Sequence, residues 1–503
     1  LAQSASSFDP GRQTHTEQEL RKFLKPIPPR SAEEARAALQ VVEGFEMQLV
    51  AAEPMVYDPI AAAFNEDGDL YVCEMRDYPF RPKPGNPALG RIRLLRDTNR
   101  DGRFDVSHVF AEDLLWVSGV APWKGGVFAT AAPDIWYLKD TDGDGQANVR
   151  RKVFTGFGDK KSQSIFNNLK WGLDHRIYGS SSGNGGSVVR ANHPDAQATE
   201  IRRQDFRFHA GTLQFEIVPS RSQFGNSFDD WGNRFLCTQA NAVFQVLWND
   251  PSPGDAILSP PGPTYNPLSG PTPIFRVSPI ERWRAIRSKR RIVSGERKAS
   301  STGASHSVLD GVAGSTVYRG DAFPEEYHGN LFVGGAQNNL IHRRSLKFAG
   351  VTVESERLDP NTEFARSPDN WFRPVNFVNA PDGTLYAVDL AREILEAVHI
   401  PFDVANVLDL THGRDRGRIF RIAPTGFNTK PAPRLSKATS SELVKLLGHP
   451  NAWHRESAHR LIFERQDKSI VPDLRSILND SARISNGSAL RRLDLFPTTF
   501  HRY

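Results

Sequence analysis

The chain has 503 residues, of which 39% are hydrophobic and 24% charged, and its formal net charge at pH 7 is +5. This composition is globular and excludes a fibrous or disordered chain, while the modest charge gives no indication of a nucleic-acid partner. No run approaches the roughly 20 consecutive apolar residues that cross a bilayer, so the sequence predicts no transmembrane segment. The 39 Gly and 35 Pro indicate many turns and favour β structure.

Residues 1–40 are expected to form an N-terminal extension. Within it, Ser31 and Glu34 have the spacing of a capping box, which predicts a short helix that continues to Leu39. The chain begins at Leu1, without Met and without a signal-like apolar segment. We therefore expect a trimmed, exported form that works in a periplasm or as a secreted protein.

One short phrase recurs six times, and each copy joins a turn with Gly or Asp to a strand of apolar and aromatic residues. The copies are DGDLYV (67–72), GGVFA (125–129), DHRIYG (174–179), WGNRFL (231–236), HGNLFV (328–333) and DGTLYA (382–387). Most intervals have room for four short strands, which make one propeller blade. Residues 41–430 are therefore predicted to form a six-bladed β-propeller, with a pair of β-sandwiches as the alternative.

Two acidic loops follow the first two phrases, DTNRDGRFD (97–105) and DTDGDGQAN (140–148). Each places oxygen-bearing side chains at positions 1, 3, 5 and 9, a Gly at position 6 and a backbone carbonyl at position 7. Calcium prefers six to eight oxygen ligands, so each loop is predicted to hold one structural calcium ion; an acidic turn without metal is the alternative. The predicted ligands are Asp97, Asn99, Asp101, Arg103, Asp105, Asp140, Asp142, Asp144, Gln146 and Asn148.

Polar residues just beyond the phrases are expected to converge at the channel mouth, because the loop after each repeated strand faces the central channel. Carboxylates, amides and arginines in a concave mouth suit a carbohydrate or polyol substrate. The alternative for each residue is a solvated side chain without function. The predicted catalytic residues are Glu74, Arg76, Asp389 and Arg373, and the predicted substrate-binding residues are Asp77, Asp134, Asn168, Asn241, Gln337 and Arg392.

Two further features concern the rest of the propeller segment. Cys73 and Cys237 lie in apolar segments and are expected to be buried free thiols, with a disulfide as the alternative. The basic run RWRAIRSKRR (282–291) is interpreted as a solvated loop, with a contact to an anionic partner as the alternative.

Residues 431–503 are predicted to form an α-helical segment. Apolar residues have helical spacing over 441–447, 453–464 and 470–478, and short antiparallel helices of this kind resemble a HEAT-type repeat. The last stretch, 481–503, shows no clear period and is expected to be a frayed or truncated end.

Several long stretches closely resemble a family of planctomycete and verrucomicrobial β-propeller proteins that are named membrane-bound dehydrogenases. They are FEMQLVAAEP (45–54), YVCEMRDYP (71–79), APDIWYLKDTDGDG (132–145), NNLKWGLD (167–174), FDDWGNRF (228–235), YRGDAFPEEY (318–327) and NWFRPVNF (370–377). Members of that family often continue into HEAT repeats and a cytochrome c domain. This chain contains no Cys-x-x-Cys-His motif, so the resemblance implies a separate cytochrome c as electron-transfer partner.

The family name reflects a more distant similarity to six-bladed sugar dehydrogenases that use pyrroloquinoline quinone. In those enzymes a His abstracts a proton from the sugar, and a Lys and two arginines bind the quinone. The positions that correspond to the His and the Lys are Ser164 and Gln337 in this chain, and Arg373 corresponds to one of the arginines. Trp371 stands at the position of the other arginine.

Three functions follow as hypotheses. The first is a calcium-binding, dehydrogenase-like oxidoreductase that acts on a sugar or polyol, with pyrroloquinoline quinone as its cofactor. The second is a carbohydrate-active lyase or glycosidase, in which Arg76, Arg373 and Arg392 supply positive charge and Glu74 or a tyrosine removes the proton. The third is a non-catalytic binding propeller whose helical tail docks partners.

Overall fold

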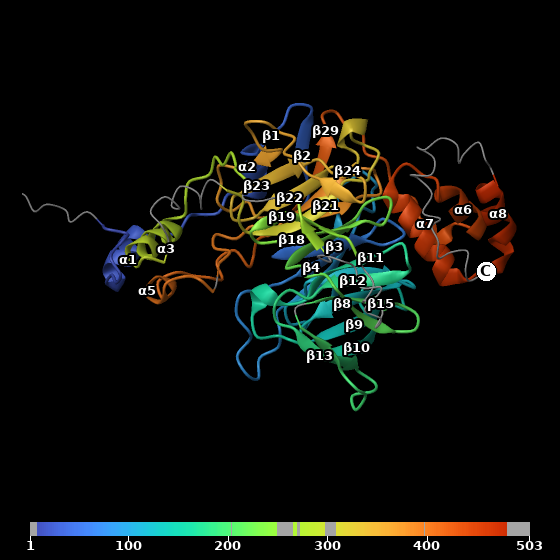
Figure 1. Cartoon of the computed structure of the whole chain (residues 1–503), viewed down its shortest axis with the longest axis horizontal. Coiled ribbons are helices and arrows are strands. Elements are labelled where there is room, and N and C mark those ends of the chain that lie inside the picture. The colour runs from blue at the N-terminus through green and yellow to red at the C-terminus, as the bar shows by residue number, and fades with distance from the viewer. Residues whose placement is uncertain are drawn as a thin grey trace, which may run out of the picture.

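A computed structural model of the chain describes residues 8–202, 204–248, 265–268, 272–296, 308–396 and 398–479. Figure 1 shows sheets in the middle of the molecule, with α1, α3 and α5 at one end and α6, α7 and α8 at the other. The sheets are the blades of a six-bladed β-propeller, so the predicted fold class is confirmed. The stretch 481–503 lies outside the described residues.

Each blade is an antiparallel sheet whose first strand lies nearest the central channel. Blade one consists of β3 (Pro59–Phe64), β4 (Leu70–Glu74), β5 (Arg91–Arg96) and β6 (Val106–Ala111). Blade two consists of β7 (Gly119–Trp123), β8 (Gly126–Ala131), β9 (Asp134–Lys139) and β10 (Val149–Phe157), and it is extended by β13 (Gly186–Arg190) and β14 (Thr199–Ile201). Blade three consists of β11 (Asn167–Trp171), β12 (Arg176–Ser180), β15 (Asp205–His209) and β16 (Phe215–Val218). Blade four consists of β17 (Phe224–Phe228), β18 (Arg234–Thr238), β19 (Asn241–Val246) and β20 (Tyr265–Pro267). Blade five consists of β21 (Val312–Val317), β22 (Leu331–Gly335), β23 (Leu340–Arg344), β26 (Ala365–Arg366) and β1 (Gln40–Val41). Blade six consists of β27 (Pro374–Asn379), β28 (Leu385–Asp389), β29 (Arg418–Pro424) and β2 (Phe45–Ala52). A separate hairpin joins β24 (Lys347–Ala349) to β25 (Thr352–Glu354).

The ring is closed by a strand from the beginning of the chain. Strand β2 is the outer strand of blade six and pairs antiparallel with β29, with Phe45 opposite Pro424 and Ala52 opposite Arg418. The first strands contact one another in the cyclic order β3, β7, β11, β17, β21 and β27, and β27 returns to β3. Such closure leaves few exposed strand edges.

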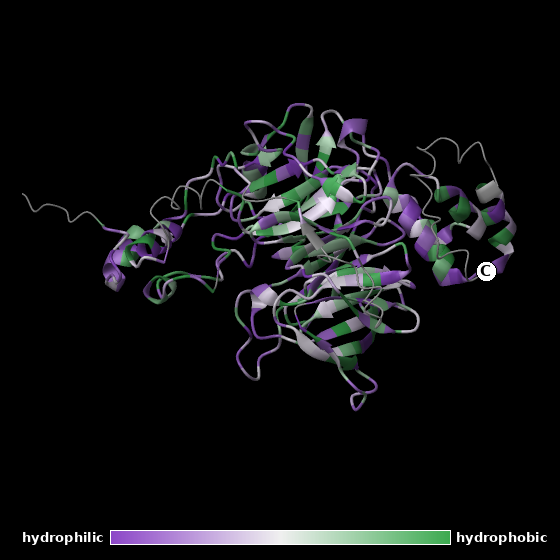
Figure 2. Cartoon of the chain, in the orientation of Figure 1, coloured by the Kyte–Doolittle hydropathy of each residue, from purple (hydrophilic) through white to green (hydrophobic). Residues whose placement is uncertain are grey.

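The repeated phrase explains why the blades form. In every blade it covers the second strand and the turn before it, namely β4, β8, β12, β18, β22 and β28. The turn glycines Gly68 and Gly383 have φ of +83° and +86°, a conformation that favours glycine. The strands that follow are almost fully buried, and Figure 2 shows hydrophobic residues along the strands of the propeller.

The helices lie outside the ring. They are α1 (Glu17–Phe23), α2 (Ala32–Ala37), α3 (Arg282–Val293), α5 (Phe402–Ala405), α6 (Ser440–Leu446), α7 (Ala452–Arg465) and α8 (Val471–Asn479), with short 3-10 turns at Ser162–Ser164, Glu325–Tyr327, Leu435–Lys437 and Lys468–Ile470. The predicted capping box of Ser31 and Glu34 opens α2, and the three C-terminal helices lie close to their predicted ranges.

The basic run 282–291 is a helix and not the solvated loop that the sequence suggested. In α3 the side chains of Trp283, Ile286 and Arg290 are buried. Trp283 and Ile286 pack with Leu20 of α1 and Val404 of α5 in one apolar cluster. Because Trp283 and Ile286 lie on successive turns of the same helix face, the run packs on this cluster as part of a helical cap made of α1, α3 and α5.

The other end of the ring is covered by α7, which contacts the turns between first and second strands. Arg460 donates to Glu66 at 3.0 Å, and the ring of Phe463 lies 4.1 Å from His175 and 5.7 Å from Trp123. Further contacts reach blades four, five and six, through the pairs Arg455–Asp230, Glu456–Arg319 and Asn451–Ala380. Helix α7 therefore touches all six blades and covers this end of the channel.

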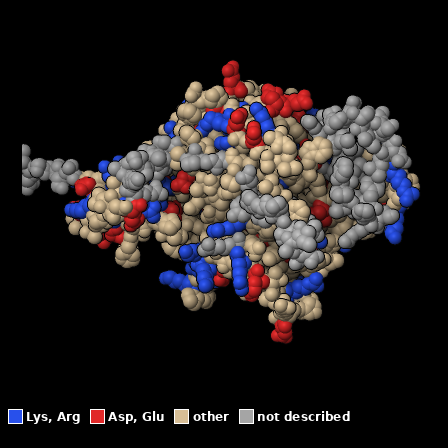
Figure 3. All heavy atoms as spheres, in the orientation of Figure 1, with Lys and Arg blue, Asp and Glu red and all other residues tan. Residues whose placement is uncertain are grey.

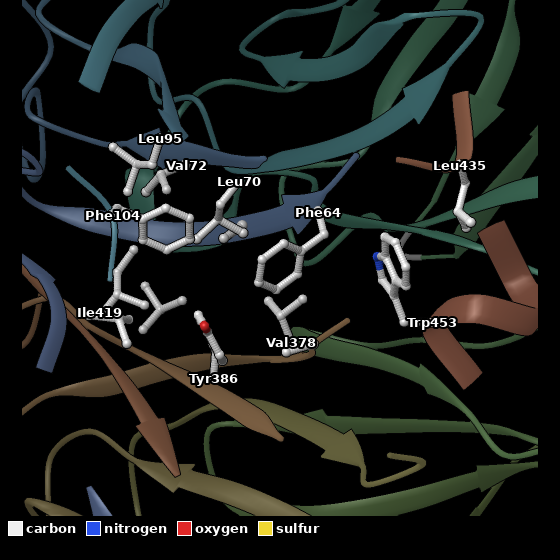
Figure 4. Close-up of a cluster of buried hydrophobic side chains, with 14 of the residues drawn as sticks. Phe64, Leu70, Val72, Leu95, Phe104, Val378, Tyr386, Ile419, Leu435 and Trp453 are labelled. Atoms are coloured by element: carbon white, nitrogen blue, oxygen red, sulfur yellow. The ribbon is translucent and has the colours of Figure 1, made fainter. Parts of the chain in front are cut away.

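The hydrophobic core continues from the blades into this helical segment. Figure 4 shows Phe64 and Val378, from blades one and six, beside Trp453 of α7. All three belong to one cluster that also includes Tyr386 and Leu435. Cys73 and Cys237 are buried free thiols, as expected. Within the described ranges, no helix has the length and apolar character needed to cross a bilayer.

Candidate functional site

The central channel contains a small cavity of about 110 Å³. Its wall comes from first strands and from loops after second strands, and amide side chains are prominent there. Tyr78 and Gln163 bond to the carbonyl of Leu395, and Arg284 of α3 donates to Gln337 at 2.6 Å. The cap thus contacts the wall of the channel at Gln337. Ligand pockets commonly measure about 300–1,000 Å³, so this cavity suits only a small guest. The lining amides are Gln163, Asn167, Asn168, Gln223, Gln239, Gln337 and Asn376.

Two of the predicted catalytic residues are fully buried carboxylates. Glu74 pairs with Arg91 and Arg93 and accepts from the backbone N–H of Tyr57, and burial raises its pKa despite these partners. Asp389 accepts from the backbone N–H groups of Arg373 and Ala391, and burial raises the pKa of Asp389 to about 6. Neither carboxylate lines the channel cavity.

The predicted arginines also lie within the protein. Arg373 is 0% exposed and donates to Glu281 at 2.8 Å and to the carbonyls of Arg392 and Ala336. Arg392, also 0% exposed, forms a bidentate pair with Asp58. Arg76 is half-buried over the ring of Tyr57.

The structure brings two of the predicted substrate-binding residues, Asn168 and Gln337, to the channel cavity. Asp77, Asp134 and Asn241 instead bond to neighbouring groups in their own blades. Asp77 accepts from the N–H groups of Leu89 and Gly90, and Asp134 lies 2.8 Å from Lys152. Asn241 donates to Thr238.

A pyrroloquinoline quinone site requires positive charge, because the quinone carries three carboxylates. Among the described residues that line the channel cavity, none is Lys or Arg. Gln337, which corresponds to the quinone-binding Lys, lines the cavity. It accepts a hydrogen bond from Arg284, and Arg284 is itself paired with Glu281. Arg373 is bonded to the same Glu281. The channel therefore does not fit the quinone.

The two acidic loops lie where the sequence places them, between the third and fourth strands of blades one and two. In the second loop, Asp140, Asp142 and Asp144 bring one oxygen each within 4.8 Å of one another. In the first loop, Asp97 Oδ1 is buried without a hydrogen-bond partner in the described chain. Gly102 and Gly145, at position 6, have φ of +85° and +88°. Oxygen side chains around such turns fit calcium.

A groove of about 1260 Å³ lies beside the cap, and we call it the cap groove. One wall is an irregular strap, residues 24–30 (LKPIPPR), and another is the start of α3. The strap is held at Ile27, whose carbonyl accepts from Trp371 Nε1 at 3.1 Å and whose N–H donates to Glu393 at 2.8 Å. The groove also includes residues 368–370 and 407–409.

Buried polar atoms without partners border the cap groove. Asp369 is 5% exposed, and its Oδ2 has no hydrogen-bond partner within the described residues; Arg30 Nε lies 3.9 Å from it. Trp283 is 3% exposed, and its Nε1 also lacks a partner there. Such atoms cost about 1–3 kcal/mol when desolvated, unless a ligand or water satisfies them.

A histidine and a carboxylate meet in the cap groove. His412 Nδ1 lies 2.6 Å from Glu393 Oε2, and the edge of the imidazole packs on Trp371. Asp409 also lines the groove. Burial alone would raise the pKa of Asp409, but hydrogen bonds from Thr411 and the charge of His412 outweigh burial and lower that pKa below its ordinary value.

Sequence reasoning did not identify His412. It belongs to the long connection between β28 and β29, outside any repeated phrase, and it is brought to Glu393 only by the fold of that connection.

Several solved structures are similar to this chain at low sequence identity. A glucose dehydrogenase-type oxidoreductase from Thermus thermophilus is 15% identical, with a TM-score of 0.44 over 75% of this chain and 100% of that chain. The apo aldose sugar dehydrogenase of Escherichia coli is 12% identical, with a TM-score of 0.43 over 76% and 99% of the two chains. The quinone domain of a Coprinopsis cinerea pyranose dehydrogenase is 14% identical, with a TM-score of 0.42 over 76% and 97%.

No curated protein matches the sequence. One protein family does, and it is described as a domain of unknown function, DUF7133. The match extends over residues 31–426, which includes the whole ring from β1 to β29 and begins directly after the strap. Because the match covers most of the chain, this protein belongs to the DUF7133 family.

Proposed function

We propose that this chain is a carbohydrate-active enzyme that binds a sugar or polyol in the cap groove. The proposal rests on Asp369 Oδ2, a buried acceptor without a hydrogen-bond partner in the described chain, and on Trp283 Nε1, a buried donor that also lacks one; both residues line the cap groove. A polyol offers hydroxyls, one of which can donate to Asp369 Oδ2 while another accepts from Trp283 Nε1. The volume of about 1260 Å³ exceeds what a single sugar requires, which favours an oligosaccharide.

The reaction class we propose is oxidation of a hydroxyl, as the resemblance to sugar dehydrogenases implies. Because the channel does not fit the quinone, the electrons require a separate acceptor. The proposal also includes a separate cytochrome c, export to a periplasm and kinship with the planctomycete and verrucomicrobial dehydrogenases. Glu74, Arg76, Asp389 and Arg373 do not line the cap groove, so their catalytic roles stay predictions from the sequence and are not part of this proposal.

Sugar binding tests the proposal directly. Tryptophan fluorescence should change on titration with oligosaccharides, because Trp283 borders the groove and Trp371 packs beside it. Asp369→Asn keeps the acceptor for the N–H of Trp371 but weakens the acceptor offered to the ligand, so we expect about tenfold weaker binding, equivalent to about 1.4 kcal/mol. Asp415→Asn, on an exposed side chain outside the groove, is the matched control.

Product analysis then separates the reaction classes. Reduction of an electron-accepting dye supports oxidation, whereas unsaturated or new reducing ends without an acceptor indicate a lyase or glycosidase. Binding without any product indicates a binding propeller. If a broad panel of mono- and oligosaccharides gives no binding, the proposal is wrong.

A further inference from the structure

The geometry of His412 differs from that of the other charged groups in the cap groove. Both oxygens of Glu393 are engaged, by the N–H of Ile27 and by His412, and Asp369 accepts from the N–H of Trp371 with Oδ1. His412 uses only Nδ1, which faces Glu393 Oε2 at 2.6 Å, and 34% of its side chain is exposed. Within the described residues, no hydrogen bond reaches its Nε2. The ring is therefore held at one nitrogen and open at the other.

Glu393 fixes which nitrogen of His412 carries the proton. A carboxylate only accepts hydrogen bonds, so a neutral His412 must donate from Nδ1, which leaves the Nε2 lone pair available. The other oxygen of Glu393 accepts from the N–H of Ile27 in the strap, so the carboxylate cannot turn away without losing that bond. Trp371 limits rotation of the ring from its side.

We propose that His412 is the proton acceptor of the cap groove and that Glu393 is its positioning residue. This inference rests on the proposed function and adds to it the group that begins the chemistry. A base must have an open lone pair, a fixed orientation and access to substrate, and His412 combines the three.

The step is a single proton transfer. The O–H bond of a substrate hydroxyl breaks, an N–H bond forms at Nε2, and the electron pair of the broken bond remains on the substrate oxygen. The imidazolium that results is stabilised by Glu393 at Nδ1 and by the nearby carboxylate of Asp409. Asp369, on the same groove, accepts a second hydroxyl and orients the sugar.

His412→Gln tests the proton acceptor. We expect turnover to fall at least 100-fold, while sugar affinity stays within about threefold, because Gln keeps a polar side chain but is not a base. His193→Gln is the control, since His193 is exposed and lies in a different surface pocket, lined by residues 188–199 and 213–215. Turnover that survives His412→Gln would overturn the inference and leave the proposed function intact.

Glu393→Gln tests the positioning role with a readout other than activity. The Gln oxygen takes over the bond from Ile27, so its NH2 group faces Nδ1 and obliges His412 to carry its proton on Nε2. In ¹⁵N-histidine NMR, we expect the Nδ1–H tautomer in the parent protein and the Nε2–H tautomer in the variant, with turnover reduced about 100-fold. The His412→Gln spectrum assigns the signals. An Nε2–H tautomer in the parent would overturn the inference.

Absence of sugar binding by the parent protein would remove the proposed function together with this inference.

Discussion

Burial decides what the polar residues near the channel do. The sequence places Glu74, Asp389, Arg373 and Arg392 beyond the repeated strands, and in the structure each has close partners inside the protein. Because a buried charge is costly without a partner, positions that converge on the axis of a propeller are often filled by ion pairs between neighbouring loops.

Arg373 provides a residue-scale prediction. Its guanidinium donates to Glu281 and to three backbone carbonyls, those of Ala336, Arg392 and Glu393, which a Lys cannot reach at once. We expect Arg373→Lys to lower the free energy of unfolding by about 2–3 kcal/mol in urea denaturation. The exposed Arg36→Lys should change it by less than about 0.5 kcal/mol. An unchanged stability with sugar binding reduced tenfold would instead support the ligand role that the sequence suggests.

At the scale of elements, the sequence predicts those strands and helices that carry a repeated phrase or a motif of fixed spacing. The phrase at 67–72 and its copies identify the second strand of every blade, and the capping box at Ser31 identifies α2. Helix α3 was missed because its arginines dominate the run, whereas Trp283 and Ile286 pack against segments more than 100 residues away. Long-range packing of this kind leaves no local signal.

The acidic hairpins give an element-scale prediction. Without metal, Asp140, Asp142 and Asp144 hold their negative charges close together, so an ion should stabilise the loop. We expect chelation to lower Tm by about 5 °C or more while the β signal in circular dichroism persists. Asp101→Ala and Asp144→Ala should each remove one calcium ion in metal analysis, and the exposed Asp195→Ala should remove none. Protein without calcium, with variants that melt like the parent, would refute both sites.

At the scale of the whole molecule, helices cover both ends of the ring, and around the cap in Figure 3 acidic and basic side chains both lie at the surface. The sequence predicted the ring from its repeats but not the cap groove. That groove joins the strap, the start of α3 and residues 393–394 and 407–412, which lie far apart in the sequence. His412 therefore could not be placed beside Glu393 from spacing alone.

Asn451 gives a prediction about the assembly of the whole. Its side chain is 0% exposed, caps α7 at Trp453 and donates to the carbonyls of Ala380 and Pro381 in blade six. We expect Asn451→Ala to cost about 2 kcal/mol in urea denaturation, because it removes the cap of α7 and the two hydrogen bonds that tie this helix to blade six. Thr439→Ala, at the exposed cap of α6, should cost about 1 kcal/mol. Equal effects would show that α7 does not hold the blades together.

The closure of the ring by β2 has a consequence for how the chain folds during synthesis. Strand β2 leaves the ribosome before any blade exists, yet its partner β29 is made after all of the others. At about 5–20 residues per second, β2 waits on the order of tens of seconds with an unpaired edge. Its apolar residues, among them Met47 and Leu49, stay accessible for that time. A chaperone that shields extended apolar segments would therefore act on this protein mainly before its last strand has emerged.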